Sequence, residues 1–241
     1  MKTIAHLAII LSCLFGLHLS SAKGQVNPKK LPLDYIEFST GKAPVGDRVS
    51  VIALHGLGDS PNNFSLGLRR SRLPIHWIIP QAPKAYGRGF SWFDIRPSFR
   101  RDPEQTGPGL NRATSTIADF IQHLRRTKAI RGKPIVIGFS QGGMLSYSLA
   151  ATHQSLLRGV IPISGFLPLT LSLPTAINIP IVALHGKIDR VVPYRLAVTT
   201  AALFSTSAPR FNLYGFDGVG HRITTEMWQL IDESLLHMLT L

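Results

Sequence analysis

The chain has 241 residues, of which 44% are hydrophobic and 16% are charged, so it can bury a large core as one globular domain. Its 26 Lys and Arg outnumber 13 Asp and Glu, and the net charge of +13 favours either a basic solvated surface or peripheral contact with an anionic membrane. The basic residues are scattered without interleaved aromatic side chains, so we expect no nucleic-acid partner.

The first part of the chain has the composition of a leader. Residues 1–22 contain a basic start at Lys2, an apolar stretch and a small-residue end at Ala22. This pattern predicts a cleaved secretory signal peptide, and therefore a secreted or periplasmic protein whose mature domain is 23–241. An uncleaved membrane anchor is the alternative. Because the single cysteine, Cys13, lies in the leader, we expect neither disulfides nor a cysteine-based zinc site in the mature chain.

Strands and helices alternate along the rest of the sequence. Apolar runs predict strands at 35–38, 49–54, 75–80, 134–137, 160–163, 181–184 and 211–216. Helical spacing predicts helices at 62–70, 110–126, 144–151, 194–204 and 223–239, the third of them packed on one face. The stretch 82–108 has no sustained period and is expected to be a functional loop. Strands that are apolar along their whole length indicate a mostly parallel α/β sheet with helices on both faces.

One motif stands between the strand 134–137 and the helix 144–151. It reads Gly138-Phe139-Ser140-Gln141-Gly142. In the order strand, G-x-S-x-G, helix, this pattern predicts a nucleophilic serine on a sharp turn. The turn forces the serine into a strained backbone conformation, and the flanking glycines let strand and helix pass closely. The alternative is an ordinary loop rich in glycine and serine.

A nucleophilic serine needs a base to take its proton and an acid to orient that base. In an open α/β sheet these groups gather beyond the carboxyl ends of the strands, in the chain order Ser, Asp or Glu, His. Asp189 follows the predicted strand 181–184, and His221 follows 211–216. We therefore expect Ser140, Asp189 and His221 to form a catalytic triad. For the aspartate, a role in a turn or helix cap is the alternative.

Acyl transfer also requires two N–H groups that stabilise the negative charge on the carbonyl oxygen. One is expected from Gln141, and the other from Leu57 in the loop His55-Gly56-Leu57-Gly58-Asp59 after an earlier strand. A simple Gly-rich turn is the alternative for that loop. His55 and His185 each end a strand before a glycine, where a buried and hydrogen-bonded histidine is expected.

Five segments occur in a specific order, and together they resemble the phospholipase/carboxylesterase family of α/β-hydrolases, which includes the acyl-protein thioesterases. They are His55-Gly56-Leu57-Gly58-Asp59, Ser91-Trp92-Phe93-Asp94-Ile95, Gly138-Phe139-Ser140-Gln141-Gly142-Gly143, Gly186-Lys187-Ile188-Asp189-Arg190-Val191-Val192-Pro193 and Gly220-His221. The resemblance covers about residues 50–239. It implies an α/β-hydrolase fold and an active site that needs neither metal nor cofactor. It also implies the roles already given for Ser140, Asp189, His221, Leu57 and Gln141, and it suggests that Trp92, Phe93 and Asp94 lie beside the site.

The chain departs from the family mainly in charge. Arg222 follows the base, where members of the family usually carry a small polar residue, and Arg96, Arg100 and Arg101 follow the Trp92 segment. Leu167 either lies on an acyl-binding side, as the resemblance suggests, or belongs to the core.

Taken together, the motifs predict an exported serine carboxylesterase acting on carboxylic esters or thioesters of short to medium chain length. The alternatives are a lysophospholipase acting at anionic lipid surfaces and a non-catalytic basic binding protein on the same fold. The sequence does not distinguish esters from thioesters, nor does it give the oligomeric state.

Overall fold

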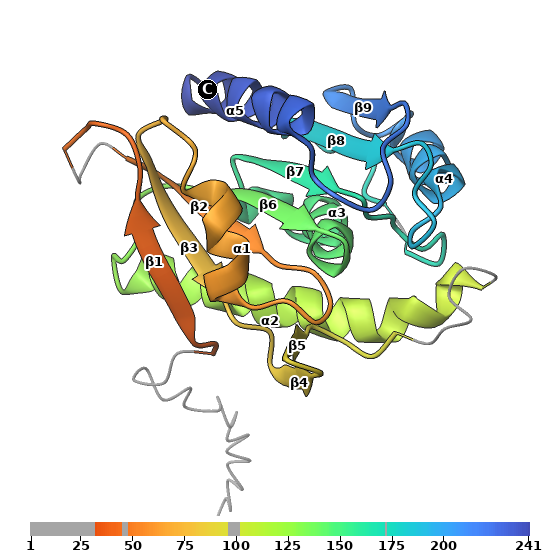
Figure 1. Ribbon diagram of the computed structural model, residues 1–241, viewed down its shortest axis with the longest axis horizontal. Coiled ribbons are helices and arrows are strands. Elements are labelled where there is room, and N and C mark those ends of the chain that lie inside the picture. Colours follow the sequence, from red (N-terminus) through yellow and green to blue (C-terminus); the bar gives the residue numbers. More distant parts are fainter. Residues whose placement is uncertain (1–31, 45–47, 96–101, 172) are drawn as a thin grey trace, which may run out of the picture. The chain divides into compact units, whose positions relative to one another are not determined.

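The computed structural model describes residues 32–44, 48–95, 102–171 and 173–241, and its largest element there is a seven-stranded sheet (Figure 1). The strands are β1 (Tyr35–Ser39), β2 (Val49–Leu54), β3 (Ile75–Pro80), β6 (Ile135–Phe139), β7 (Gly159–Ile163), β8 (Ile181–Gly186) and β9 (Phe211–Phe216). They lie in the order β1-β3-β2-β6-β7-β8-β9. β1 runs antiparallel to β3, and the other pairs are parallel, which confirms the mostly parallel sheet predicted from the sequence.

Helices cover both faces of this sheet. α1 (Pro61–Leu68) and α5 (Thr225–Leu239) pack on one face, and α2 (Gly107–Arg126), α3 (Gln141–His153) and α4 (Tyr194–Phe204) pack on the other. Successive side chains of a strand point to opposite faces, and β2 shows the consequence. Val51 and Ala53 join the core under α1 and α5, whereas Ile52 and Leu54 join the core under α2 and α3.

The helix α3 differs from its prediction in how it packs. It was expected to bury one face, yet Gln141 to Ala151 are all buried. The reason is that α2 lies over the side of α3 that faces away from the sheet, where Thr114 donates a hydrogen bond to Ser148 at 2.9 Å. The uncharged, mostly small residues of α3 allow this sandwiching between a sheet and a helix.

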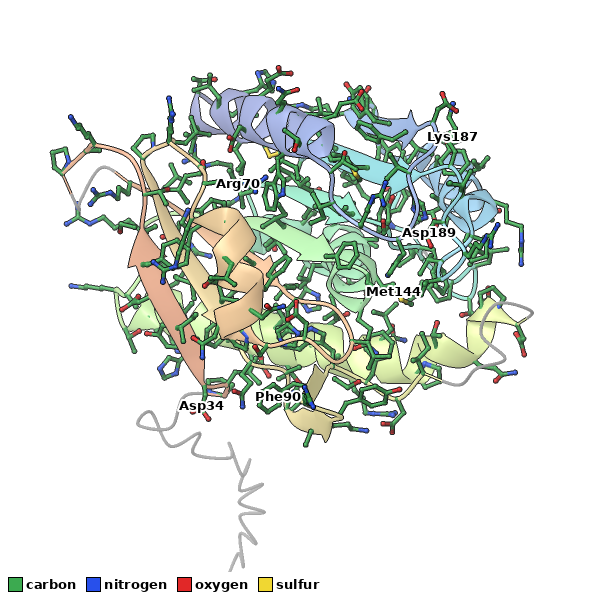
Figure 2. The ribbon with its side chains drawn as sticks, in the orientation of Figure 1. Asp34, Arg70, Phe90, Met144, Lys187 and Asp189 are labelled. Atoms are coloured by element: carbon green, nitrogen blue, oxygen red, sulfur yellow. The ribbon has the colours of Figure 1, made fainter. Side chains whose placement is uncertain are left out.

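The stretch 82–108, expected to be a loop, contains short regular elements. β4 (Lys84–Tyr86) and β5 (Gly89–Ser91) form a hairpin, a 3₁₀ turn spans Pro103–Thr106, and α2 begins at Gly107. A second 3₁₀ turn, Gln154–Leu156, follows α3. Strands of three residues are too short to give a periodic signal in the sequence. The hairpin contacts the loop after β2, where Gly58 N–H donates to Phe90 O at 2.8 Å and Phe90 N–H donates to Asp59 O at 2.9 Å (Phe90 is labelled in Figure 2).

Some expectations fall on parts of the chain that the structure does not describe. The predicted leader 1–22 with Cys13 lies outside the described residues, as do Arg96, Arg100 and Arg101. From Leu31 onward the chain forms one compact unit, while the predicted boundary at the end of the leader stays a prediction. Across the described ranges, we find no helix that is both long and apolar enough to span a bilayer.

Candidate active site

The turn between β6 and α3 has the strained geometry that the motif predicts. Ser140 has φ 56° and ψ −113°, outside the regions favoured by residues with a side chain. Its N–H donates to the carbonyl of Ile163 at 2.9 Å, which fixes the turn against β7. A Cβ added to Gly138 would lie 2.1 Å from Gly142 O, and one added to Gly142 would lie 2.0 Å from Leu54 O. Only glycine at these two positions lets strand and helix approach this closely.

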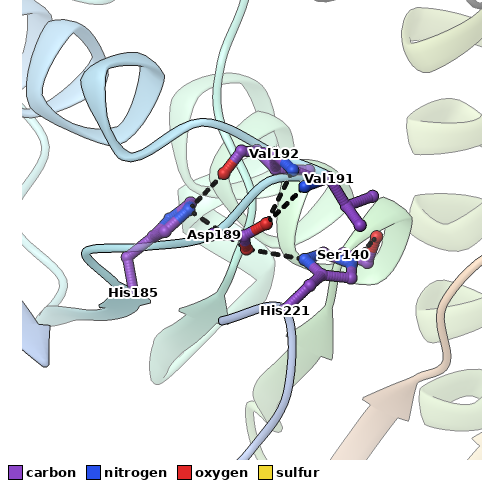
Figure 3. A network of polar contacts seen from close by, with 6 residues as sticks. All are labelled: Ser140, His185, Asp189, Val191, Val192 and His221. Carbon is purple, nitrogen blue, oxygen red and sulfur yellow. Dashed lines mark hydrogen bonds and ion pairs between the residues drawn. The ribbon is translucent and has the colours of Figure 1, made fainter. Parts of the chain in front are cut away.

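Three side chains that are far apart in the sequence meet at this turn (Figure 3). Ser140 Oγ lies 3.0 Å from His221 Nε2, and His221 Nδ1 lies 2.6 Å from Asp189 Oδ2. The carboxylate of Asp189 can only accept a hydrogen bond, so Nδ1 of His221 carries the proton. Nε2 is then free to accept from the serine hydroxyl. The ring of Phe139 packs beside the imidazole, with 4.8 Å between ring centroids. The structure thus brings together the three residues that the sequence predicted to act together.

The carboxyl group of Asp189 is fully enclosed and held at both oxygens. Oδ1 accepts from the N–H groups of Val191 and Val192 at 2.8 and 2.9 Å, while Oδ2 contacts His221. Burial is the strongest single influence on its pKa and raises it. The hydrogen bond from His221, the imidazole charge and the two N–H donors together outweigh burial, so the pKa of Asp189 is lowered. The group is therefore a carboxylate at neutral pH, as an orienting acid requires.

Two backbone N–H groups lie close to the serine. Gln141 begins α3, where the first N–H groups have no partner within the helix and the helix dipole favours negative charge. Leu57 lies in the loop after β2, and a Cβ on its neighbour Gly56 would lie 3.4 Å from Ser140 Cβ. Within the described residues the Leu57 N–H has no hydrogen-bond acceptor. That these two N–H groups stabilise a negative charge beside Ser140 stays a prediction.

The side chain of Gln141 ties a further segment to the turn. Its Oε1 accepts from Trp92 N–H at 3.1 Å, and its Nε2 donates to Phe93 O at 2.8 Å. The indole N–H of Trp92 in turn donates to His55 O at 2.9 Å, at the end of β2. The motif predicts a role only for the backbone of Gln141, and the contacts of its amide are not visible in the sequence because the partners lie 48 and 49 residues away.

A cavity of about 530 Å³ lies beside this segment and is lined in part by Trp92, Phe93 and Asp94. None of the triad residues lines it. The carboxylate of Asp94 is exposed and pairs with Lys84 Nζ at 2.6 Å. Leu167, the fourth predicted substrate-binding residue, is only 2% exposed and lies in the core under α2, α3 and α4. The four substrate-binding assignments stay predictions.

The two histidines that end strands are buried and hydrogen-bonded, as expected. His55 Nδ1 donates to Gly56 O at 2.8 Å, and its Nε2 accepts from Ala82 N–H at 3.2 Å. His185 Nε2 donates to Val192 O at 2.8 Å. Burial lowers the pKa of both histidines, which keeps both rings neutral. His185 Nε2 also lies 3.5 Å from Asp189 Oδ2, a contact that no motif in the sequence indicates.

Metal ligands are not grouped in the ranges that the structure describes. No three side chains of His, Cys, Asp or Glu lie together there as they would around an ion. The imidazole of His221 is already held between Ser140 and Asp189. That the site needs no metal or cofactor stays a prediction.

The chain is similar in sequence and in fold to known esterases and thioesterases. The family model for phospholipase/carboxylesterase matches residues 42–239. Acyl-protein thioesterase 1 of Candida albicans is 30% identical over 203 residues, covering 74% of this chain and 87% of that protein. Among solved structures, esterase PE8 matches with a TM-score of 0.72 at 22% identity, covering 83% of this chain and 99% of that one. Zea mays acyl-protein thioesterase 2 matches with a TM-score of 0.68 at 22% identity, covering 86% and 99%.

The predicted export is wrong. The curated relatives that the chain matches are acyl-protein thioesterases, and the leader on which export was based lies outside the described residues. The apolar stretch of residues 1–22 also contains His6 and His18, polar side chains that weaken its match to the apolar region of a signal peptide. A secreted or periplasmic location is therefore not part of the function developed below.

The family model, the relatives and the solved structures agree with one another. The two solved structures establish the α/β-hydrolase architecture, while the family model and the relatives identify an enzyme that hydrolyses carboxylic esters or thioesters. A non-catalytic binding protein on this fold is therefore not retained as an alternative. The chain belongs to the phospholipase/carboxylesterase family and is a serine hydrolase with the α/β-hydrolase fold.

Proposed function

We propose that this protein hydrolyses carboxylic esters or thioesters of short to medium acyl chains, with Ser140, His221 and Asp189 as its catalytic residues. The observation that carries the proposal is the row of hydrogen bonds from the serine hydroxyl through the imidazole to the buried carboxylate, at 3.0 and 2.6 Å. Thioesters are included because relatives that are 30% and 29% identical to this chain are named acyl-protein thioesterases.

The proposed reaction begins when Ser140 Oγ attacks the carbonyl carbon and His221 Nε2 takes the hydroxyl proton. The carbonyl oxygen becomes negative and is stabilised by the N–H groups of Leu57 and Gln141. The tetrahedral intermediate then collapses, and His221 gives its proton to the leaving alcohol or thiol. The remaining acyl-enzyme is hydrolysed by a water molecule that His221 activates, which restores the free serine. Throughout, Asp189 orients the imidazole and stabilises its charged form.

One observation favours the second candidate, a lysophospholipase acting at anionic lipid surfaces. Arg190 and Arg222 directly follow the proposed acid and base, and both are exposed. Neither guanidinium has a hydrogen-bond or ion-pair partner among the described residues, whereas nearby Lys187 pairs with Asp217 at 3.0 Å. Two unpaired positive charges beside the site favour substrates whose leaving group is negatively charged.

A panel of esters and thioesters tests the proposal. It varies acyl length from acetyl to dodecanoyl and pairs each neutral leaving group with a sulfonated one. We expect turnover with a maximum at short to medium chains. If the two arginines matter, kcat/KM should be about fivefold higher for anionic leaving groups, as expected for about 1 kcal/mol of attraction at a protein surface. This preference should disappear at about 0.5 M salt, where charges are screened within a few ångströms.

Charge-neutral variants separate the two candidates. In the double variant Arg190→Gln, Arg222→Gln the preference should be lost while turnover of neutral esters persists. The matched control is Arg126→Gln, which removes one exposed charge at the end of α2. A preference that survives both the double variant and high salt would reject the role of the arginines. The absence of turnover on every ester and thioester would reject the proposed function itself.

A further inference from the structure

His185 lies one residue before the end of β8 and is 1% exposed. Its Nε2 lies 2.8 Å from Val192 O and 3.5 Å from Asp189 Oδ2 (Figure 3). Both of these atoms are acceptors, so Nε2 carries the proton. Burial is the strongest influence on the pKa of His185 and lowers it, against the opposing effects of Val192 O and Asp189. The ring is therefore a neutral donor, with Nδ1 unprotonated.

The backbone of Val192 connects the imidazole of His185 to the carboxylate of Asp189. The carbonyl of Val192 accepts from His185, and the N–H of the same residue donates to Asp189 Oδ1 at 2.9 Å. Asp189 Oδ2 lies between two imidazoles, His221 at 2.6 Å and His185 at 3.5 Å. His185 is thus linked to Oδ1 through the backbone of Val192, and the same ring lies 3.5 Å from Oδ2.

The two halves of the loop after β8 are held differently. In the first half, Lys187 N–H donates to Phe216 O at 2.9 Å, and Ile188 N–H donates to Val219 O at 3.1 Å. These bonds attach the loop to β9 and the segment that follows it. The second half reaches the surface, where Val191 is 41% exposed, and then turns inward at Val192. The bond from His185 joins that inward turn to the end of β8, so it fixes the half of the loop that donates to Asp189 Oδ1.

We propose that His185 is a positioning residue for hydrolysis, a neutral imidazole that holds Val192 and Asp189 in place so that the carboxylate orients His221. This inference rests on the proposed function of Ser140, His221 and Asp189. His185 does not touch substrate and acts only through the carboxylate. A protonated ring would place a second cation beside Asp189 in competition with His221, so the neutral state is part of the role.

In the part of the chain that the structure describes, the charged and titratable groups that face the imidazole of His185 come from the loop after β8, from the start of α4 and from the segment after β9. Asp189 and His221 have been described, and Tyr194 faces the ring edge-on at 5.8 Å between centroids. Lys187 lies close to Tyr194. A Cβ added to Gly215 would lie 2.9 Å from Lys187 Cε and 2.5 Å from the Tyr194 hydroxyl. Its ammonium pairs outward with Asp217.

The test compares His185→Phe, which keeps a buried flat ring without the donor, with His185→Gln, whose amide can donate to Val192 O. In the Phe variant we expect kcat on the best ester to fall about 10- to 100-fold with KM changed much less, a loss typical when the group that holds a reacting residue is removed. The acid limb of the pH profile of kcat/KM should also move to higher pH. The reason is that, without the bond from His185 to Val192 O, the Val192 N–H is held less firmly against Asp189 Oδ1, and a carboxylate with a weaker donor attracts the imidazolium proton of His221 more strongly. The Gln variant should recover most of kcat and the original acid limb.

The control is His123→Phe, the same exchange at a buried histidine of α2 away from the triad. Folded His185→Phe protein with the kcat and acid limb of the wild type would overturn the inference while leaving the proposed function intact. Equal losses in the Phe and Gln variants would also overturn it, since they would indicate a role in folding only. If the wild-type protein has no turnover on any ester, the proposed function fails first.

If the variants do not fold, the donor role of His185 can be tested on the wild-type protein. Nitrogen NMR of histidine-labelled protein at neutral pH should show His185 as the neutral tautomer protonated at Nε2. A charged imidazolium, or the tautomer protonated at Nδ1, would contradict the donor role. This result does not depend on catalytic activity.

Discussion

Ser140→Ala is expected to lower kcat/KM on p-nitrophenyl esters by about 10⁴- to 10⁶-fold, the range seen when the nucleophile of a Ser-His-Asp triad is removed. The loss should appear in kcat, because the substitution removes the attacking hydroxyl and leaves every other side chain in place. The substitution removes one hydroxyl and its 3.0 Å contact with His221. The variant should therefore fold normally, with a melting temperature close to that of the wild type.

The matched control is Ser115→Ala, at an exposed serine of α2 whose hydroxyl bonds only to its own helix at Asn111 O. It should keep full turnover. Folded Ser140→Ala protein that hydrolyses the same esters at an appreciable fraction of the wild-type rate would show that the nucleophile lies elsewhere.

Gly142→Ala is expected to destabilise the protein more than any single change at the surface. The added Cβ would lie 2.0 Å from Leu54 O and 2.9 Å from Leu54 Cβ, in the buried strand β2. Neither the backbone of a strand with neighbours on both sides nor α3, sandwiched between the sheet and α2, can move aside cheaply. We expect a loss of more than about 4 kcal/mol of unfolding free energy, which corresponds to a melting temperature lower by about 10 °C or more.

Thermal unfolding followed by circular dichroism measures this effect. Gly220→Ala is the control, because a Cβ there would meet nothing within 4 Å and the residue does not have positive φ. Its melting temperature should lie within a few degrees of that of the wild type, because a substitution that causes no clash changes stability only slightly. A Gly142→Ala variant with an unchanged melting temperature would contradict the close packing of strand and helix around the serine.

Local patterns predicted much of the fold. β2, β3, β9 and α4 begin and end where the sequence places them, because each is a regular apolar or amphipathic run. Position in the sheet was harder to foresee. β9 exposes alternate residues although it was expected to be covered on both faces, since it forms an edge of the sheet. α3 is buried all round because α2 packs over its side that faces away from the sheet, a contact that the pattern of either helix alone does not reveal.

The triad residues could be predicted because their positions after strands follow from the topology of parallel sheets. The supporting contacts could not. The amide of Gln141 reaches Trp92 and Phe93, and His185 reaches around its own loop to Asp189. A sequence pattern gives the residue types but not which side chains meet, so these contacts become visible only in the folded chain. The prediction for residues 1–22 failed in a different way. Their composition was interpreted as a signal for export, and the relatives contradict export.

Reaction with a fluorophosphonate is the sharpest test of whether Ser140 is an activated nucleophile. The folded protein is incubated with the probe, digested and mapped by mass spectrometry, beside a His221→Ala sample in which the base is missing. We predict one adduct per chain, on Ser140, forming far more slowly in the His221→Ala protein. An adduct on a different residue, no adduct on folded protein, or equal labelling rates in the two samples would show that Ser140 is not a nucleophile activated by His221.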